Sequence, residues 1–263
     1  MRKISWILKR HSFLYSTRFR LLSRNSSEEG VASETYNDFN KVADIPDIYI
    51  DINKKIFKDV HLNTDLEKAF HIARWLREHI KGGSGLSLPS DLALKAMLDG
   101  KGGVCSDISQ VFNNFCVINE ILVREWGIMR IPFDMKYGGH ATNEVFSKEL
   151  NKWVLIDVSK CITFNTGIES CPLSVIEVFK CRDNLSYHSF FKEIVDDKQI
   201  KNYYFSPSAT PFLISRYKNK VYDKFLKKSP SKFPIFIVHF VVYLTGNSYH
   251  YKFPLVNYRT MFM

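Results

Sequence analysis

The segment GKGGVCSDISQVFNNFCVINEIL, residues 100–122, decides the fold. A glycine-rich turn leads into a stretch whose apolar residues recur at steps of three and four, which predicts a helix. Cys105 lies at or just before its first turn. The unpaired N–H groups and positive dipole end of a helix favour thiolate over thiol there, so we expect a nucleophilic cysteine. The apolar positions are Ile108, Val111, Phe112, Phe115, Ile118 and Leu122.

A predicted hairpin supplies two further polar residues. GHATNEVF (residues 139–146) and NKWVLIDVS (residues 151–159) are typical of antiparallel strands joined by the four residues 147–150. With Phe146 opposite Asn151, His140 falls directly opposite Asp157. Opposite Cβ atoms lie roughly 4.5 to 5.5 Å apart, close enough for a carboxylate to hold an imidazole.

The side-chain parity of the hairpin agrees with this pairing, because alternate residues of a strand face opposite sides of a sheet. One predicted face is apolar and the other carries the histidine and the aspartate. The apolar face holds Ala141, Val145, Val154, Ile156 and Val158. The other face holds His140, Thr142, Glu144, Trp153 and Asp157.

In chain order, GGVCSD, GHATNEVF and KWVLIDVS resemble the transglutaminase-like superfamily of papain-type cysteine enzymes. Members of that superfamily carry a Gly-x-Cys at a helix start, a His-Ala-(aromatic)-x-Glu-Val strand and a Trp-x-x-x-Asp strand. The spacings here are 35 positions from Cys105 to His140 and 17 from His140 to Asp157. The resemblance implies an α+β fold in which the helix bearing the cysteine packs on an antiparallel sheet bearing the histidine and aspartate.

The resemblance also implies roles. Cys105 is the nucleophile, His140 the general base and acid, and Asp157 the residue that orients the histidine. The chemistry is acyl transfer on an amide through a thioester, and it requires no metal or organic cofactor. Thr142 departs from the pattern, standing where the family usually has an aromatic residue. The Cys105 backbone N–H is the one oxyanion donor that we name, since Trp75 matches no motif for the second.

The motif does not choose the acceptor: water gives a protease or amidase, and an amine gives a transamidase. Bacterial proteins of this type are often associated with exopolysaccharide gene sets, which implies a glycan or peptide precursor as substrate. Asn143 and Glu144 are interpreted as structural, and Asp107 as a helix cap rather than a base. The alternative hypothesis is a non-catalytic transglutaminase-like binding module.

Charge is distributed unevenly along this 263-residue chain, whose formal net charge is +10. Residues 1–24 hold seven Lys or Arg and no acid, and residues 216–263 hold nine against Asp223. Basic ends fit an anionic membrane surface or an acidic glycan, and the alternative is that they are solvated charges without a partner. Nucleic acid is disfavoured because no recognition motif accompanies the charges. Five cysteines and no secretory-signal pattern predict a cytoplasmic protein, with peripheral membrane contact as an open alternative.

The predicted organisation has three parts. Residues 1–40 are a basic leader and polar linker, 41–165 the transglutaminase-like core, and 166–263 an extension that completes or flanks it. Within the core, a Thr64-x-x-Glu67 capping box predicts a helix over residues 64–80. A second helix runs from Ser90 to Gly100. In the extension, residues 217–225 have the pattern of a basic amphipathic helix. FPIFIVHFVVYL (residues 233–244) favours a buried strand, with a membrane-dipping element as the alternative.

Overall fold

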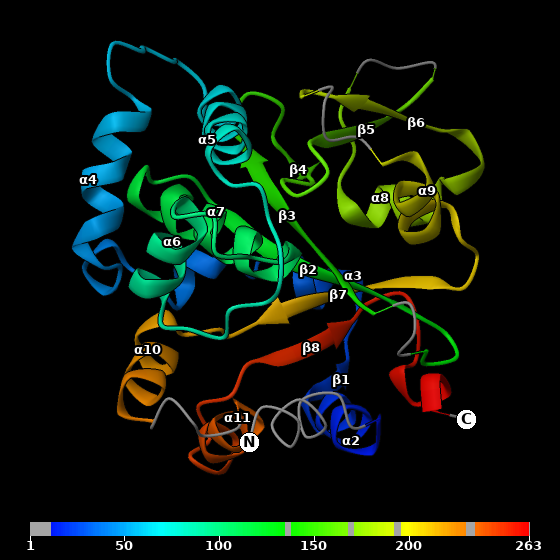
Figure 1. Ribbon diagram of the computed structural model, residues 1–263. Helices are drawn as coiled ribbons and strands as arrows, with labels where there is room; N and C mark the ends of the chain where they lie inside the picture. The colour runs from blue at the N-terminus through cyan, green and yellow to red at the C-terminus, as the bar shows by residue number, and fades with distance from the viewer. Residues whose placement is uncertain (1–11, 135–137, 168–170, 192–195, 230–234, 263) are drawn as a thin grey trace.

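The computed structural model describes residues 12–134, 138–167, 171–191, 196–229 and 235–262. Its centre is a six-stranded sheet in the order β1-β8-β7-β2-β3-β4, antiparallel except for the parallel pair β1 and β8 (Figure 1). Its strands, in that order, are β1 (Ser23–Asn25), β8 (His250–Phe253), β7 (Ala209–Ser215), β2 (Val123–Arg130), β3 (His140–Ser147) and β4 (Lys152–Ile156). A separate two-stranded sheet pairs β5 (Ile162–Thr166) with β6 (Leu185–Ser189).

Helices cover one face of the large sheet beside β2, β3 and β4. They are α4 (Asp47–Ile56), α5 (Asp65–His79), α6 (Ser90–Leu98) and α7 (Cys105–Ile118). α7 packs directly on β2 and β3, and α4, α5 and α6 surround it (Figure 1). Phe112 and Phe115 of α7 share a buried cluster with Val145 and Val154 of the sheet, so this helix is the centre of the main core.

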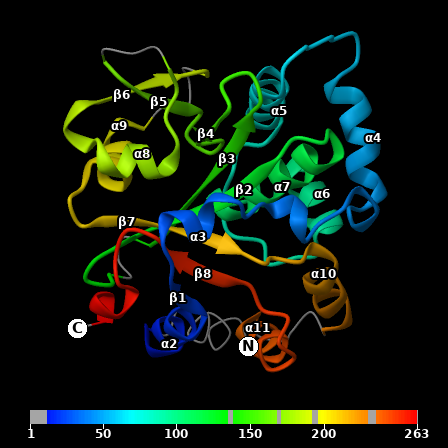
Figure 2. The same cartoon turned by 180° about the vertical axis from the view of Figure 1, so that it is seen from behind.

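The opposite face of the sheet is covered by shorter elements (Figure 2). These are α3 (Glu28–Ala32), α8 (Val175–Lys180), α9 (Asp197–Ile200) and a π-helical turn η5 (Lys201–Phe205). Trp126, Leu155 and Phe164 form the middle of this second core. The remaining short turns are the 3₁₀ segments η1 (Tyr36–Asp38), η2 (Val42–Asp44), η3 (Arg182–Asn184) and η6 (Tyr258–Phe262).

The chain ends extend the fold at the β1–β8 edge, where α2 (Ser12–Leu22) and α11 (Ile235–Leu244) lie beside the sheet (Figures 1 and 2). α10 (Asn219–Lys228) joins β7 to this region and packs against α11. Phe19 of α2 is buried with Phe212 and Phe253 in a third cluster. Segments far apart in the sequence therefore meet over β7 and β8.

The structure confirms the α+β class and three predicted helices. α7 begins at Cys105, α6 runs from Ser90 to Leu98, and α5 begins after Thr64. The predicted capping box is present: Thr64 Oγ1 accepts from the Glu67 N–H at 3.1 Å, and Glu67 Oε2 accepts from the Thr64 N–H at 3.1 Å. α10 is also the predicted basic helix, but its apolar residues Val221 and Phe225 pack on the main core.

The predicted hairpin register was wrong by two residues. Phe146 pairs with Trp153 rather than with Asn151, and Ser147 pairs with Lys152. The loop is thus residues 148–151, and Asn151 takes a left-handed φ of 48°, a conformation that asparagine tolerates better than most residues. Because the shift is even, each side chain stays on its predicted face.

Two other predictions were wrong. Residues 24–38, part of the predicted leader and linker 1–40, include the end of β1, α3 and η1. Val31 and Tyr36 are buried and anchor this segment to the cores. The described part of the predicted strand 233–244 is α11, whereas residues 233 and 234 lie outside the described residues. In α11, Val238 and Val242 are buried one helical turn apart, so packing overrides the β preference of its residues.

Gly127 in β2 leaves space for a ring of the neighbouring strand. A Cβ at this position would overlap Phe212, with Cε1 at 2.8 Å and two other ring atoms closer still. We expect Gly127→Ala to lower the free energy of unfolding by about 1–3 kcal/mol, the usual cost of overpacking. Urea denaturation checks this value. Gly167→Ala, whose Cβ would meet only ordinary contacts, is the control, and equal stability of both variants would contradict the packing argument.

Candidate active site

Two glycines deliver the chain to Cys105. Gly102 and Gly103 have φ values of +136° and +114°, and a Cβ on them would lie 2.6 Å from the Ser84 carbonyl oxygen and 2.7 Å from the Met97 sulfur. The Gly103 N–H donates to the same Ser84 oxygen at 2.9 Å. Since L side chains rarely adopt these angles, only glycine fits both positions. The nucleophile candidate is therefore placed by a tight contact between two glycine-rich loops.

Asp107 fixes the start of α7. One of its carboxylate oxygens accepts the backbone N–H of Val104 at 2.9 Å and that of Leu86 at 3.3 Å. These bonds satisfy a donor at the helix start and tie the upstream loop to it, which is the capping role predicted for this residue. The Cys105 thiol is partly exposed beside this loop.

His140 is the first residue of β3 and lies between the cysteine and the aspartate. Its Nε2 is 2.6 Å from Asp157 Oδ2, and both side chains are buried. A hydrogen bond also joins the Cys105 thiol and the His140 ring. With Nε2 directed at the carboxylate, Nδ1 is the ring nitrogen left for the sulfur. The structure thus brings the three predicted residues together.

Asp157 directly follows β4 and is held by four donors. Oδ1 accepts the Lys160 backbone N–H at 2.9 Å and the Ser159 hydroxyl at 3.0 Å, and Oδ2 accepts the Tyr204 hydroxyl at 2.8 Å besides His140. A buried carboxylate is costly unless its oxygens are paired in this way. The carboxylate therefore has a fixed orientation toward the imidazole.

The pKa values of the three groups favour an ion pair. Burial raises the pKa of the Cys105 thiol, but the bond to His140 and its charge outweigh this and the pKa is lowered overall. Burial lowers the pKa of His140, yet Asp157 and Cys105 together raise it to about 10. Burial raises the pKa of Asp157, and His140, Tyr204 and Lys160 together lower it. Thiolate, imidazolium and carboxylate therefore stabilise one another.

Two tyrosines of η5 complete the histidine environment, and sequence reasoning missed both. The Tyr203 ring stacks on the His140 imidazole at 4.5 Å between centroids and 14° between planes. The Tyr204 ring stands edge-on to the imidazole at 6.0 Å. An aromatic face over an imidazolium stabilises its charge. Tyr203 and Tyr204 lie 63 and 64 positions after His140, in a segment without a recognisable motif. No signal in the sequence therefore identified them.

Asn143 fixes α7 against β3. Its amide nitrogen donates to the Ser109 carbonyl at 3.1 Å and to Asn113 Oδ1 at 2.7 Å. All three residues are buried. Because Cys105 is on α7 and His140 is on β3, this contact fixes the position of the sulfur relative to the imidazole. Asn143 is thus a structural residue, as predicted.

Glu144 is also engaged in structural contacts. It forms a buried ion pair with Arg124 at 2.5 Å, and it accepts a hydrogen bond from the Trp126 indole at 2.5 Å. Its other oxygen accepts the Val175 N–H at 2.5 Å at the start of α8. Glu144 faces away from the cysteine and ties α8 to the sheet, in agreement with its structural interpretation.

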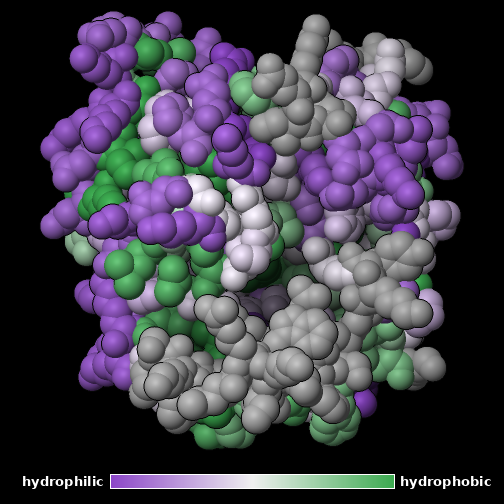
Figure 3. Space-filling view, viewed as in Figure 1, coloured by the Kyte–Doolittle hydropathy of each residue, from purple (hydrophilic) through white to green (hydrophobic). Residues whose placement is uncertain are grey.

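A cavity of about 620 Å³ reaches Cys105 and His140. Its walls come from the loop 85–88, the first turns of α7, strands β2, β7 and β8, and helices α2 and α11. In the space-filling view a hollow opens near the middle of this face, with hydrophobic side chains at its border (Figure 3). Much of the wall thus comes from both ends of the chain.

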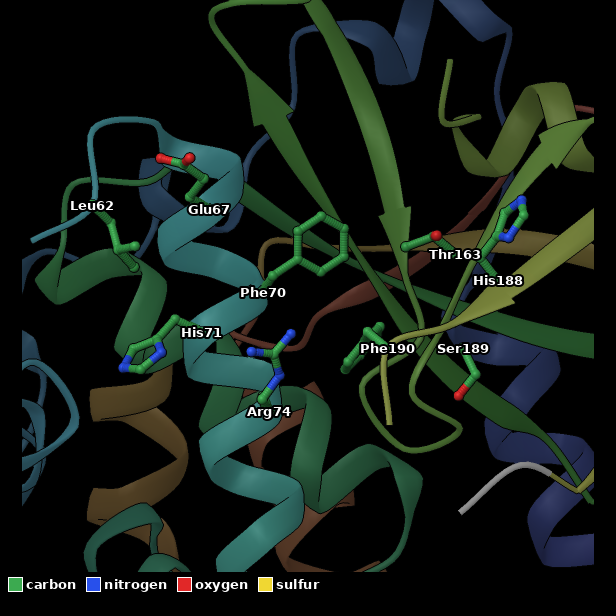
Figure 4. Close-up of a pocket in the computed structure, with 9 residues that line it drawn as sticks. All are labelled: Leu62, Glu67, Phe70, His71, Arg74, Thr163, His188, Ser189 and Phe190. Atoms are coloured by element: carbon green, nitrogen blue, oxygen red, sulfur yellow. The ribbon is translucent and has the colours of Figure 1, made fainter. Parts of the chain in front are cut away.

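A second pocket of about 350 Å³ lies between α5 and the two-stranded β5–β6 sheet. Phe70 and Arg74 of α5 face Thr163 and Phe190 across it (Figure 4). It shares no lining residue with the cavity at Cys105. We assign it no part in the chemistry.

With this geometry in view, the comparisons with known proteins identify the core. Residues 54–158 match the family model of the transglutaminase-like superfamily. These residues belong to that superfamily. The matched segment contains Cys105, His140 and Asp157, and it lies within the predicted core 41–165.

This chain is also similar to a solved structure, a candidate cysteine protease from Cytophaga hutchinsonii. The two chains are 16% identical with a TM-score of 0.34. The match covers 63% of this chain and 46% of that one, so this chain spans less than half of the other's length. No curated protein matches this chain.

The lowered thiol pKa predicts fast alkylation of Cys105 below the ordinary pKa of a thiol. We expect iodoacetamide to react with Cys105 at pH 7 at least about tenfold faster than in His140→Ala, because the variant keeps the burial that raises the thiol pKa and loses the imidazolium that lowers it. Rates measured across pH 5–9 by intact mass check this. Cys105→Ser gives the background from the other four cysteines. An unchanged pH profile in His140→Ala would exclude the ion pair.

Proposed function

We propose that the protein is a cysteine-dependent enzyme that cleaves or exchanges an amide bond through a thioester. The observation that carries the proposal is the continuous chain of contacts from Cys105 through His140 to Asp157, with the last contact at 2.6 Å. The superfamily of residues 54–158 and the cavity at the sulfur support it. As substrate we propose an amide of a peptide or glycan precursor.

The first half-reaction makes the acyl-enzyme. The Cys105 thiolate attacks the amide carbon and forms a C–S bond, while the carbonyl π electrons move onto oxygen. As the tetrahedral intermediate collapses, the C–N bond breaks and the His140 imidazolium gives its proton to the departing amine. Asp157 keeps the imidazole in the orientation that this transfer needs.

The second half-reaction releases the acyl group. Water or an amine gives a proton to His140 and attacks the thioester carbon, and the C–S bond breaks to return the thiolate. The Cys105 backbone N–H at the start of α7 is the oxyanion donor that we propose for both steps, because helix N-termini present N–H groups without intrahelical acceptors.

Asp157→Asn tests the orienting role. The amide keeps the volume of the carboxylate but cannot stabilise the imidazolium, so we expect turnover to fall by about 10²–10⁴-fold. The thermal midpoint of the variant, measured alongside, separates this loss from unfolding. Turnover that stays near the wild-type value in folded Asp157→Asn would contradict the proposed role.

The mass of the products shows whether water or an amine accepts the acyl group. The protein is incubated with a library of peptide amides, with and without hydroxylamine, which traps acyl thioesters as hydroxamates. We expect acid products without the amine and hydroxamates with it, and neither with Cys105→Ala. If the yield of acid falls as hydroxamate forms, amines compete with water for the acyl-enzyme.

The competing function is a binding module that keeps the transglutaminase-like fold without catalysis. It requires a Cys105 thiol of ordinary reactivity, which the contacts with His140 and the lowered thiol pKa disfavour. An ordinary alkylation profile and no products from the library would establish the module instead.

For the partners, we propose peripheral contact with an anionic membrane through α11. Phe240 and Leu244 are 53% and 67% exposed on that helix, and the exposed lysines Lys224 and Lys228 lie on the adjacent α10. Exposed apolar groups beside cations are typical of interfacial binding. Among the described residues, no helix is long and apolar enough to span a bilayer.

Vesicle sedimentation tests this contact. We expect the protein to sediment with vesicles rich in phosphatidylserine and the double variant Phe240→Ser, Leu244→Ser to stay in the supernatant. Leu150→Ser, which removes an exposed leucine from the distant β3–β4 loop, is the control. Wild-type protein that stays in the supernatant would refute the contact.

A further inference from the structure

Glu125 is a buried carboxylate in the wall of the cavity that reaches Cys105. It lies in the middle of β2, opposite Asn143 of β3 and Ile214 of β7, with 1% of its surface exposed. Oε2 accepts the Asn113 amide at 3.2 Å, whereas Oε1 has no partner among the described residues. None of the ion pairs in the described part of the chain includes Glu125.

A buried carboxyl with an unpartnered oxygen is expensive to keep in a fold. Burial, and then the charges of Cys105 and Asp107, raise the pKa of Glu125 to about 8. A cation placed in the cavity would restore the ionised form and satisfy the second oxygen. Because no described cation pairs with Glu125, an ammonium of the substrate is a group that this carboxyl can bind.

Two cations line the same cavity, the His140 imidazolium and the Arg18 guanidinium, and each has its own partner. Arg18 of α2 donates a hydrogen bond to the Tyr249 hydroxyl, and its guanidinium lies 5.9 Å from the centre of the Tyr249 ring. Tyr217, Tyr222 and Tyr251 line the same space. Tyrosine rings attract cations as well as apolar chains, so this wall accepts an alkyl chain that ends in an ammonium.

Helix α7 indicates how long the alkyl chain of the substrate is. Asn113, the partner of Glu125, follows Cys105 by eight residues in α7, which is about 12 Å along the axis. The approach of sulfur to carbon and the contact of ammonium with carboxylate take about 3 Å each. The side chains of Cys105 and Glu125 and these two contacts take up part of the axial rise, and a substrate chain of about the length of a lysine side chain fits the remainder.

We propose that Glu125 is a specificity residue that binds a primary ammonium of the substrate, carried on the acyl group at about the reach of a lysine side chain from the carbonyl carbon. This inference rests on the proposed function, because the ammonium is positioned relative to a carbonyl attacked by Cys105. It narrows the substrate to amides whose acyl part carries an amine. Glu125 acts in binding and takes no part in the bond-making steps.

Two alkylating reagents of equal length test this proposal without a known substrate. N-(3-aminopropyl)-2-bromoacetamide carries an ammonium, and N-butyl-2-bromoacetamide has a methyl group in its place. Second-order inactivation rates of Cys105 in the full chain are measured by intact mass at pH 7. We expect the ammonium reagent to react at least tenfold faster with wild-type protein and at nearly the rate of the butyl reagent with Glu125→Gln.

Glu120→Gln, which removes an exposed carboxylate after the end of α7, is the matched control and is expected to keep the tenfold ratio. Should Glu125→Gln fail to fold, Ile214→Lys provides the second variant. It places an ammonium on β7 opposite Glu125, and it should also bring the ratio near one.

The outcomes are distinct. A ratio near one in wild-type protein, or a tenfold ratio kept in folded Glu125→Gln, overturns the ammonium site. Equal slowing of both reagents in Glu125→Gln assigns the residue a structural role and also overturns the site. Failure of the proposed function is recognised separately, as ordinary alkylation of wild-type Cys105 by iodoacetamide across the pH range.

Discussion

The buried contact between His140 and Asp157 is the interaction on which the site depends. Two ionised groups without solvent are stable only when every remaining donor and acceptor is paired, and the fold meets this condition from several elements. The turn after β4 supplies Ser159 and Lys160, and η5 supplies Tyr204. A stack with Tyr203 covers the imidazole. The His140–Asp157 pair therefore links the β3–β4 hairpin to η5, which lies more than forty residues later in the sequence.

The site was predictable from sequence because its three residues belong to locally patterned segments. The helix start at Cys105 follows from glycine placement and periodicity, and the faces of β3 and β4 follow from alternation. The register was off by two, so Thr142 rather than His140 lies opposite Asp157 when the observed pairing is extended. The imidazole still reaches the carboxylate, because diagonal neighbours on one face remain within the reach of an aromatic side chain.

Other features were beyond local reasoning because tertiary contacts decide them. Tyr203 and Tyr204 acquire their positions only when η5 packs behind the sheet. The β-branched residues of α11 indicated a strand, yet the helix forms because Val238 and Val242 meet the core on one face. Polar residues 24–38 have a weak pattern, and Tyr36 anchors them through a hydrogen bond to Asn114. In each case a long-range partner outweighs the local preference.

The proposed function places chemistry and recognition in different parts of the chain. Cys105, His140 and Asp157 all lie within residues 54–158, the part that matches the superfamily. Much of the cavity wall comes from outside that segment, with Arg18 on one side and Tyr249 and Tyr251 on the other. Glu125 belongs to both parts, because it lies in the segment that matches the superfamily and also lines the cavity. On that proposal, changes in the terminal segments or at Glu125 would alter substrate choice while the contacts of the imidazole stay fixed.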